Sequence, residues 1–284
     1  MKPSDQADGL RKLLEPRLPR MVSVVSCGPA TGRTVLAVNL AAAIARHGRS
    51  VVLIDENSAI GNACDLLGLR PRCELAHALA GDRTLRDVLL TGPCGIMIMP
   101  AARGLRMIGR AEGVELIARA RLDRLLALMD FVIVDAAPGG VGALALPVAA
   151  HGEAIVVTST GAQTVTQAYA RIKELGGRFP RAALRAAVCR AHSEDEAKIV
   201  CANLADVAER HLGLRLGSPG IVCEDPRIAR AGGVLVDAFP RSRAAAQFHT
   251  LAAAMQTAAA ASHGAQRRGA VRAGTDKASA SLAA

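Results

Sequence analysis

Aromatic residues are scarce in this sequence: tryptophan is absent, tyrosine occurs once, at Tyr169, and there are four phenylalanines. Proteins that bind single-stranded nucleic acid without sequence preference stack bases on aromatic side chains, so this composition argues against such a platform. The net charge of +10 is carried mostly by arginine. Arginines spread over many surface helices account for it, although a basic surface also favours contact with nucleic acid, acidic lipid or an acidic partner.

Paired cysteine motifs and long apolar segments are also missing. The seven cysteines form no C-x-x-C pair, and their scatter is typical of reduced thiols in the cytosol rather than of a disulfide framework or a zinc site. Asp5 and Asp8 stand where a signal peptide needs an apolar segment. No run of about 18 apolar residues occurs, so no membrane-spanning helix is predicted. We therefore expect a cytoplasmic protein.

Apolar runs of strand length alternate with helical patterns through the middle of the chain. This alternation predicts an α/β fold, a doubly wound, mostly parallel sheet with helices on both faces and a ligand at the carboxyl ends of the strands. The expected strands are 22–25, 51–54, 96–99, 131–134, 154–158 and 184–188. The expected helices lie near 33–47, 112–129, 162–175 and 194–212. Glycines predict two helix ends, at Gly48 and at Gly176-Gly177.

The two ends of the chain differ from this middle. Residues 1–20 contain one short predicted helix, whereas residues 21–258 carry the α/β pattern without an internal repeat. Residues 259–284 are small and polar with scattered arginines, which predicts a disordered tail. The sequence thus predicts one α/β domain between two short terminal segments.

An apolar stripe near the end of the α/β pattern is a candidate membrane anchor. It consists of Phe248, Leu251 and Met255, and the side chains opposite it carry no cation. A helix that lies on a membrane surface usually has lysine or arginine there, so we interpret the stripe as the core face of the final helix. Arginines of the tail add a weak attraction to anionic lipid, and we expect at most peripheral, transient membrane contact.

Residues 22–40, VSVVSCGPATGRTVLAVNL, have the layout of a phosphate-binding loop. A β-branched run turns through small residues into Gly32-Arg33-Thr34, and an amphipathic helix follows. Such loops bind phosphate because backbone N–H groups and a helix N-terminus face the anion.

This segment resembles the deviant Walker A sequence of MinD/ParA-type ATPases, GKGGxGK[ST], and the resemblance implies ATP and Mg²⁺ as ligands. The implied nucleotide-binding residues of the loop are Cys27, Gly28, Pro29, Ala30, Thr31, Gly32, Arg33 and Thr34. Only Gly32 and Thr34 match the pattern strictly. Gly28 replaces a signature lysine that, in this family, reaches the partner's nucleotide across a dimer. Arg33 replaces the phosphate-loop lysine, and its planar fork is not equivalent to an ammonium group.

The acidic positions depart from the family pattern as well. Asp55-Glu56-Asn57 follows the second predicted strand, where the family carries D-x-D, so the implied catalytic residues are Arg33, Asp55 and Asn57. Asn57 cannot act as a carboxylate base. Asp135 corresponds to the Walker B acid, and the implied magnesium site is therefore Thr34 with Asp135.

The remaining departures from the family pattern affect the backbone of the loop and the residues that contact the adenine base. Pro29 removes one N–H from the anion site, and Ala30 resists the positive φ that glycine permits. Cys189-Arg190 stands where the family reads adenine with Asn-Arg, and cysteine is a poor hydrogen-bond partner for a purine. Two interpretations stay open, a pseudo-ATPase with very weak or lost hydrolysis and a working but unusual ATPase.

The amino-terminal heptapeptide DQADGLR resembles the DQAxxLR motif of the flagellar-number ATPases of the FlhG, FleN and YlxH family. In that family the segment docks on the flagellar SRP-type GTPase FlhF and stimulates its GTP hydrolysis. The resemblance therefore implies that Asp5, Gln6, Ala7, Leu10 and Arg11 bind this partner. The apolar positions share one helical face, which suits a groove. The alternative is a helix packed against its own domain or a frayed terminus.

The likeness to this family extends over residues 4–255, including 62–90 and 220–248. It implies a regulator of flagellar number or placement, with FlhF, basal-body components and a second copy as partners and no sequence-specific nucleic acid. One alternative is an active ParA-type ATPase that positions cargo by nucleotide-gated dimerisation on DNA or membrane. A second alternative, an iron–sulfur carrier, requires paired cysteines that the sequence does not contain.

Overall fold

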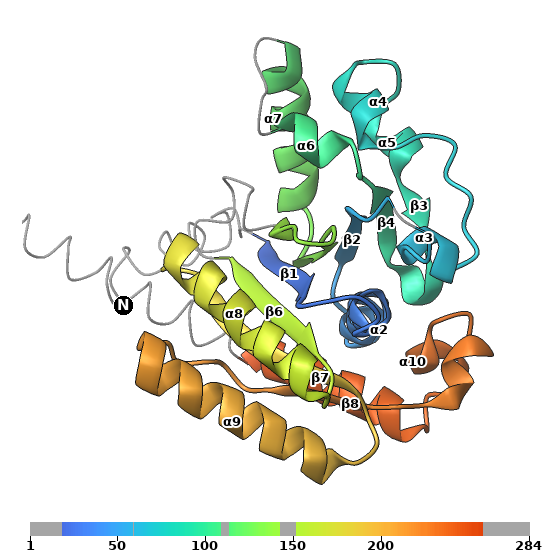
Figure 1. Ribbon diagram of the computed structural model, residues 1–284. Coiled ribbons are helices and arrows are strands. Elements are labelled where there is room, and N and C mark those ends of the chain that lie inside the picture. The colour runs from blue at the N-terminus through green and yellow to red at the C-terminus, as the bar shows by residue number, and fades with distance from the viewer. Residues whose placement is uncertain (1–18, 59, 109–113, 143–151, 258–284) are drawn as a thin grey trace, which may run out of the picture.

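A central eight-stranded sheet organises the fold (Figure 1). The computed structural model describes residues 19–58, 60–108, 114–142 and 152–257. The strand order is β3-β4-β2-β5-β1-β6-β7-β8, and every neighbouring pair is parallel except β3 with β4. The strands are β1 (Arg20–Ser26), β2 (Val51–Asp55), β3 (Leu90–Thr91), β4 (Met97–Pro100), β5 (Phe131–Asp135), β6 (Glu153–Thr158), β7 (Ala183–Ala191) and β8 (Gly220–Cys223). The prediction of a doubly wound, mostly parallel sheet is confirmed.

Helices connect the strands on both faces of the sheet. They are α2 (Arg33–Arg46), α3 (Ala63–Leu66), α4 (Leu75–Leu79), α5 (Leu85–Val88), α6 (Gly104–Ile108), α7 (Val114–Ala127), α8 (Ala162–Arg178), α9 (Glu194–Leu212), α10 (Leu235–Ala238) and a last helix over residues 243–257. None of these helices is long and apolar enough to cross a membrane.

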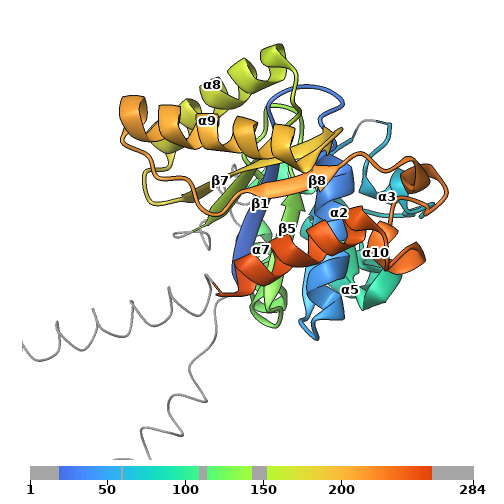
Figure 2. The same cartoon turned by 90° about the horizontal axis from the view of Figure 1, so that it is seen from below.

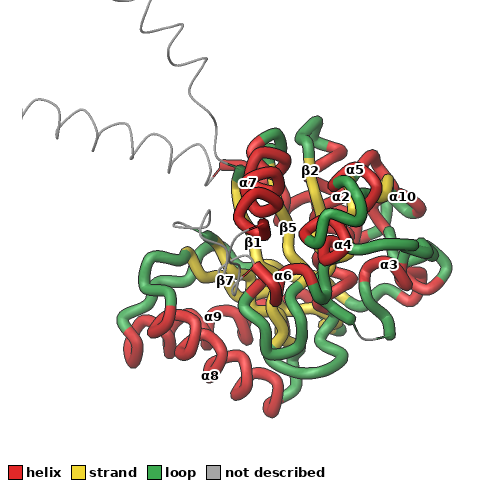
Figure 3. The backbone as a smooth tube through the Cα atoms, turned by 90° about the horizontal axis from the view of Figure 1, so that it is seen from above, coloured by secondary structure: helices red, strands yellow, loops and turns green. Residues whose placement is uncertain are grey.

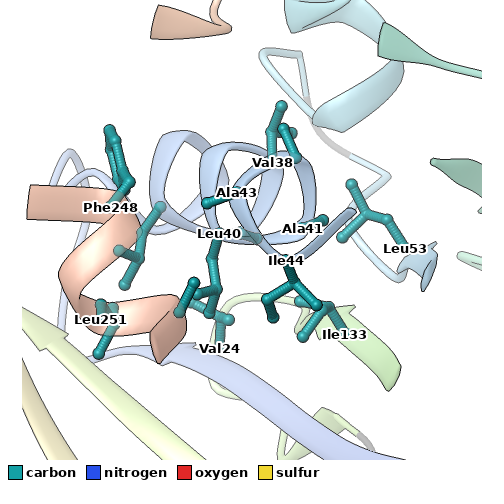
Figure 4. Close-up of a cluster of buried hydrophobic side chains, with 14 of the residues drawn as sticks. Val24, Val38, Leu40, Ala41, Ala43, Ile44, Leu53, Ile133, Phe248 and Leu251 are labelled. Atoms are coloured by element: carbon teal, nitrogen blue, oxygen red, sulfur yellow. The ribbon is translucent and has the colours of Figure 1, made fainter. Parts of the chain in front are cut away.

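The face of the sheet that carries α2 also carries the last helix, and the two helices lie side by side (Figure 2). Residues of a strand point alternately to opposite faces, and Val24 of β1 joins this core together with Leu40 of α2. Figure 4 shows these side chains with Phe248 and Leu251 of the last helix. Phe248, Leu251 and Met255 are 1%, 2% and 0% exposed, so the interpretation of this stripe as a core face is confirmed.

The opposite face of the sheet is covered by two separate groups of helices. Val52 of β2 packs with α4 and α7 around one apolar cluster, whereas Val156 of β6 packs with α8 and α9 around another. Seen from above, α8 and α9 lie at the other end of the molecule from α4 and α5 (Figure 3). The parallel strands between these layers are buried on both faces, which explains their continuous apolar runs.

One predicted helix end was wrong. Gly48 follows α2 with φ +77° and ends it as expected, but α8 continues through Gly176 and Gly177 to Arg178. A Cβ placed at Gly176 would collide with the side chain of Leu214. This glycine therefore serves packing within a helix rather than its termination, and the helix tolerates it because burial of the apolar face outweighs the low propensity.

A buried amide ties α2 to the carboxyl-terminal part of the fold. Asn39, in the middle of α2, is 0% exposed. Its Nδ2 donates to the carbonyl oxygens of Val35, at 2.9 Å, and Gly233, at 2.6 Å. Its Oδ1 accepts the backbone N–H of Val236 at 3.3 Å. The side chain is thereby satisfied inside the core, as a buried polar group requires.

Candidate nucleotide site

The loop between β1 and α2 lines a cavity of about 670 Å³. β1 lies between β5 and β6, where the chain changes direction across the sheet, and ligands bind at such switch points at the carboxyl ends of strands. All eight loop residues predicted from the resemblance line the cavity: Cys27, Gly28, Pro29, Ala30, Thr31, Gly32, Arg33 and Thr34. The structure thus brings these eight residues together around one cavity, and their role in binding nucleotide stays a prediction.

The loop has the backbone geometry expected of a phosphate-binding turn. Ala30 has φ +55° and Gly32 has φ +89°, both in the left-handed region. Ala30 adopts this conformation although its Cβ makes it unfavourable by about 1–2 kcal/mol. Arg190 also has a positive φ, +58°, and its Nη1 donates to the carbonyl oxygen of Ala30 at 3.1 Å. Two strained residues thus support each other, as is common at functional sites.

A buried ion pair lies at the end of the loop. Asp135, the last residue of β5, is 0% exposed. The Nε of Arg33 donates to its Oδ1 at 2.6 Å, and the hydroxyl of Thr34 donates to its Oδ2 at 2.8 Å. Burial raises the pKa of Asp135, against the opposing effects of Arg33 and Thr34. The positive charge of Arg33 is therefore neutralised by an acid of its own chain.

The residues implied for magnesium have suitable donor chemistry. Mg²⁺ takes oxygen ligands, and the Thr34 hydroxyl and the Asp135 carboxylate provide them side by side, 2.8 Å apart. Thr34 and Asp135 are thus the residues that would hold the ion. However, Arg33 binds the same carboxylate. A divalent cation and the guanidinium group therefore compete for Asp135.

The three predicted catalytic residues are not all at the cavity surface. Arg33 and Asn57 line the cavity, whereas Asp55, 3% exposed, does not. Asp55 lines a smaller cavity of about 250 Å³, which Asn57 lines as well. The carboxylate of Asp55 accepts the backbone N–H of Asn57 at 3.1 Å and that of Cys64 at 3.3 Å. Burial, with Asp135 nearby, raises the pKa of Asp55 to about 7.

The neighbouring acid, Glu56, is held by the loop that follows β5. Its carboxylate accepts the backbone N–H of Ala137 at 3.1 Å, and burial raises its pKa. Glu56 thus connects the end of β2 to the loop after β5, and Asp55 connects it to α3.

The residues predicted to read the base line a second cavity of about 650 Å³ beside the first. Ala30 and Gly32 line both cavities, so the two adjoin at the loop. Cys189 and Arg190 both line it, and their contact with a base stays a prediction. Burial raises the pKa of the Cys189 thiol to about 12, which makes it an apolar wall rather than a reactive group. Sequence reasoning missed Phe248, which lines this cavity from the last helix.

Two residues of α8 that lie near the first cavity were also not identified from the sequence. Arg171 is 8% exposed and lines the first cavity. Gln167 lies one helical turn earlier, and its Oε1 is 2.7 Å from the position that a Cβ at Gly28 would occupy. The spacing of four residues places both on one helix face. The sequence does not indicate that this helix face contacts the phosphate loop, because the two segments are far apart in the chain and meet only in the folded structure.

The predicted partner-binding residues Asp5, Gln6, Ala7, Leu10 and Arg11 lie outside the described residues. The predicted tail, residues 259–284, lies outside them as well.

The parallel sheet with a phosphate-type loop at its switch point is the arrangement of P-loop nucleotide-binding proteins. No family model matches the sequence. The chain is 32% identical over 237 residues to the antiactivator FleN of Pseudomonas aeruginosa. The aligned region covers 82% of this chain and 85% of FleN. It is 22% identical over 156 residues to the flagellum site-determining protein YlxH of Helicobacter pylori, covering 54% of this chain and 53% of that protein.

Among solved structures, the fold is similar to the septum site-determining protein MinD of Pyrococcus horikoshii, solved in complex with Mg-ADP. The TM-score is 0.61 at 24% identity, over 82% of this chain and 94% of that chain. The chain therefore belongs to the MinD/ParA family of P-loop ATPases. Within that family it groups with the flagellar-number regulators FleN and FlhG.

Proposed function

We propose that this protein is a MinD-like regulator of flagellar number or placement that works by binding, with weak or lost ATP hydrolysis. Its family membership and its similarity to FleN support the regulatory role. Its partner would be the flagellar SRP-type GTPase FlhF. Residues 1–20 would bind this GTPase and stimulate its GTP hydrolysis, while residues 21–258 form the regulated domain.

The observation that carries the proposal is the ion pair between Arg33 and Asp135. Phosphoryl transfer depends on cations that neutralise the charge developing on the phosphate oxygens. In this chain the loop cation binds the acid that should serve magnesium, and Gly28 supplies no cation to the nucleotide of a partner. Nucleotide binding without efficient turnover is the expected result, and it suits a protein that acts as a ligand-stabilised scaffold.

The second candidate function is an active ParA-type ATPase that positions cargo by dimerising on DNA or membrane. The observation that favours it is the retained pair of oxygen donors, the Thr34 hydroxyl and the Asp135 carboxylate. It requires Arg33 to leave Asp135 when Mg-ATP binds. Peripheral membrane contact and a homodimer are compatible with both candidates. A dimer gated by nucleotide belongs to the second, because Gly28 lacks the lysine that would reach the partner's nucleotide.

Calorimetric titration of Mg-ATP into the full chain, with phosphate release measured on the same sample, distinguishes the two candidates. We expect heat of binding with negligible phosphate release. The matched control is Thr34→Ala, which removes one of the two oxygen donors and should weaken binding only when magnesium is present. Steady phosphate release by the wild-type protein would favour the active ATPase.

The partner-binding role is tested by measuring the GTP hydrolysis of FlhF with the full-length protein. Leu10→Ala and Gln6→Ala should abolish the stimulation. Lys12→Ala, on the other side of the predicted helix, is the matched control and should stimulate like the wild type. Equal stimulation by all variants would refute the role of this segment.

A further inference from the structure

Arg171 of α8 has a hydrogen-bonding group that the fold does not use. An arginine side chain carries five N–H donors. The Nη1 of Arg171 donates to Glu174 at 2.5 Å, and its Nη2 donates to the carbonyl oxygens of Gly139, at 3.1 Å, and Gly140. Among the described residues its Nε, although buried, has no hydrogen-bond partner. Buried donors are normally paired, so Arg171 keeps a spare hydrogen-bonding group.

Arg171 itself lines the nucleotide cavity, while its unpaired Nε is buried. Its side chain is 9% exposed and lines the same cavity as the loop of residues 27–34. Gly28, which has no side chain, lines that cavity too, and the amide of Gln167 lies in the space beside it. Helix α8 thus supplies polar groups from the same chain on the side where the loop supplies none.

The charges around the cavity favour Arg171 as the cation for a bound phosphate. Among the described residues that line it, the cations are Arg33 and Arg171. Arg33 is paired with the fully buried Asp135. Arg171 is paired with Glu174, whose side chain is 49% exposed, so solvent screens this acid. The charge of Arg171 is therefore the less neutralised of the two.

We propose that Arg171 binds the terminal phosphate of a bound nucleoside triphosphate within its own chain. It would take the role that a lysine at position 28 has across a dimer in the family. This inference rests on the proposed function in one respect, that the site binds nucleotide. Since Arg171 also holds the carbonyl groups of Gly139 and Gly140, the same side chain links the terminal phosphate to the loop after β5. Arginines supplied from the same chain serve this purpose in other phosphate-binding proteins.

The test compares the affinities for ATP and ADP in the full-length protein, measured by calorimetry with magnesium. Arg171→Gln should weaken ATP binding by about tenfold and ADP binding by less than about threefold, because only ATP carries the terminal phosphate. Arg171→Lys keeps the charge without the fork and should lie between the two. Lys173→Gln, an exposed lysine of the same helix, is the matched control and should change neither affinity.

The unfolding temperature without nucleotide shows whether each variant is folded. If Arg171→Gln does not fold, Arg171→Lys carries the comparison. ATP binding at the wild-type level in the folded variant, or equal losses for ATP and ADP, would overturn the inference. Absence of nucleotide binding in the wild-type protein would overturn it as well. Stimulation of FlhF by that same protein would then still support the regulatory function.

Discussion

Replacing Asp55 with asparagine should change how the stability of the protein depends on pH. Asp55 is 3% exposed, and burial raises its pKa from 3.8 to about 7, with a further contribution from Asp135. The folded chain therefore keeps a proton on Asp55 up to about pH 7, whereas the unfolded chain releases it near pH 4. Because the folded state binds more protons, its stability falls as the pH rises through this window and is constant above it.

The size of the effect follows from the shift in pKa. A change from 3.8 to about 7 corresponds to about 4 kcal/mol of folding free energy. Asparagine carries no charge at any pH, so this loss is absent in Asp55→Asn. The variant still accepts hydrogen bonds from the N–H groups of Asn57 and Cys64 through its amide oxygen. Any loss in those bonds is a constant offset that does not depend on pH.

The measurement is urea unfolding of both proteins without nucleotide, at several pH values from about 4.5 to 8. Because the sequence has no tryptophan and one tyrosine, circular dichroism is the suitable probe. The stability of the variant relative to the wild type should increase by about 3 kcal/mol over this range, because about 1 kcal/mol of the full effect falls below pH 4.5. Glu56 and Asp135 also have raised pKa values, but they are present in both proteins and cancel. A difference that stays flat with pH would refute the reasoning.

Three further substitutions test the site and the core by urea unfolding at neutral pH. Asp135→Asn leaves the buried guanidinium of Arg33 unpaired and should cost about 3–5 kcal/mol, whereas the exposed Asp206→Asn should cost less than about 1 kcal/mol; equal costs would contradict the ion pair. Phe248→Ala should cost about 3–5 kcal/mol because the side chain is 1% exposed, and a cost below about 1 kcal/mol would show that the last helix is not part of the core. Ala30→Gly should stabilise the protein by about 1 kcal/mol by relieving the strain at φ +55°, and a loss of stability would show that the loop is not strained.

Most of the fold could be predicted from the periodicity of apolar residues. Parallel strands buried on both faces give continuous apolar runs, which is why β1, β2, β4, β5, β6 and β7 were found. The edge strand β3 was missed because it is two residues long. The other edge strand, β8, was missed because its apolar run, residues 221–223, is only three residues long. Gly176 was misread because the local signal for a helix end is the same as that for close packing, and only the contact with Leu214 distinguishes them.

The candidate site was predictable where its residues are close in sequence. The loop of residues 27–34 forms one wall of the cavity, and its strand–loop–helix layout and its resemblance to the deviant Walker A sequence identified it as a unit. Arg171 and Gln167 could not be found in this way, since they reach the cavity through the packing of α8 on the sheet. The ion pair of Arg33 with Asp135 could not be predicted from the sequence either. It depends on which acid a buried guanidinium meets after folding, and those two residues are 102 positions apart.

The hydrogen bonds of Asn39 bear on how the chain folds during synthesis. This amide belongs to the first helix after the phosphate loop, but Gly233 and Val236 follow it by 194 and 197 residues. A ribosome delivers the helix long before these partners exist, and a buried amide without partners is costly. The phosphate loop and its helix therefore reach their final packing only after nearly the whole domain has been made. A chain that stops before residue 233 would lose the support of its nucleotide site, not merely an edge of the fold.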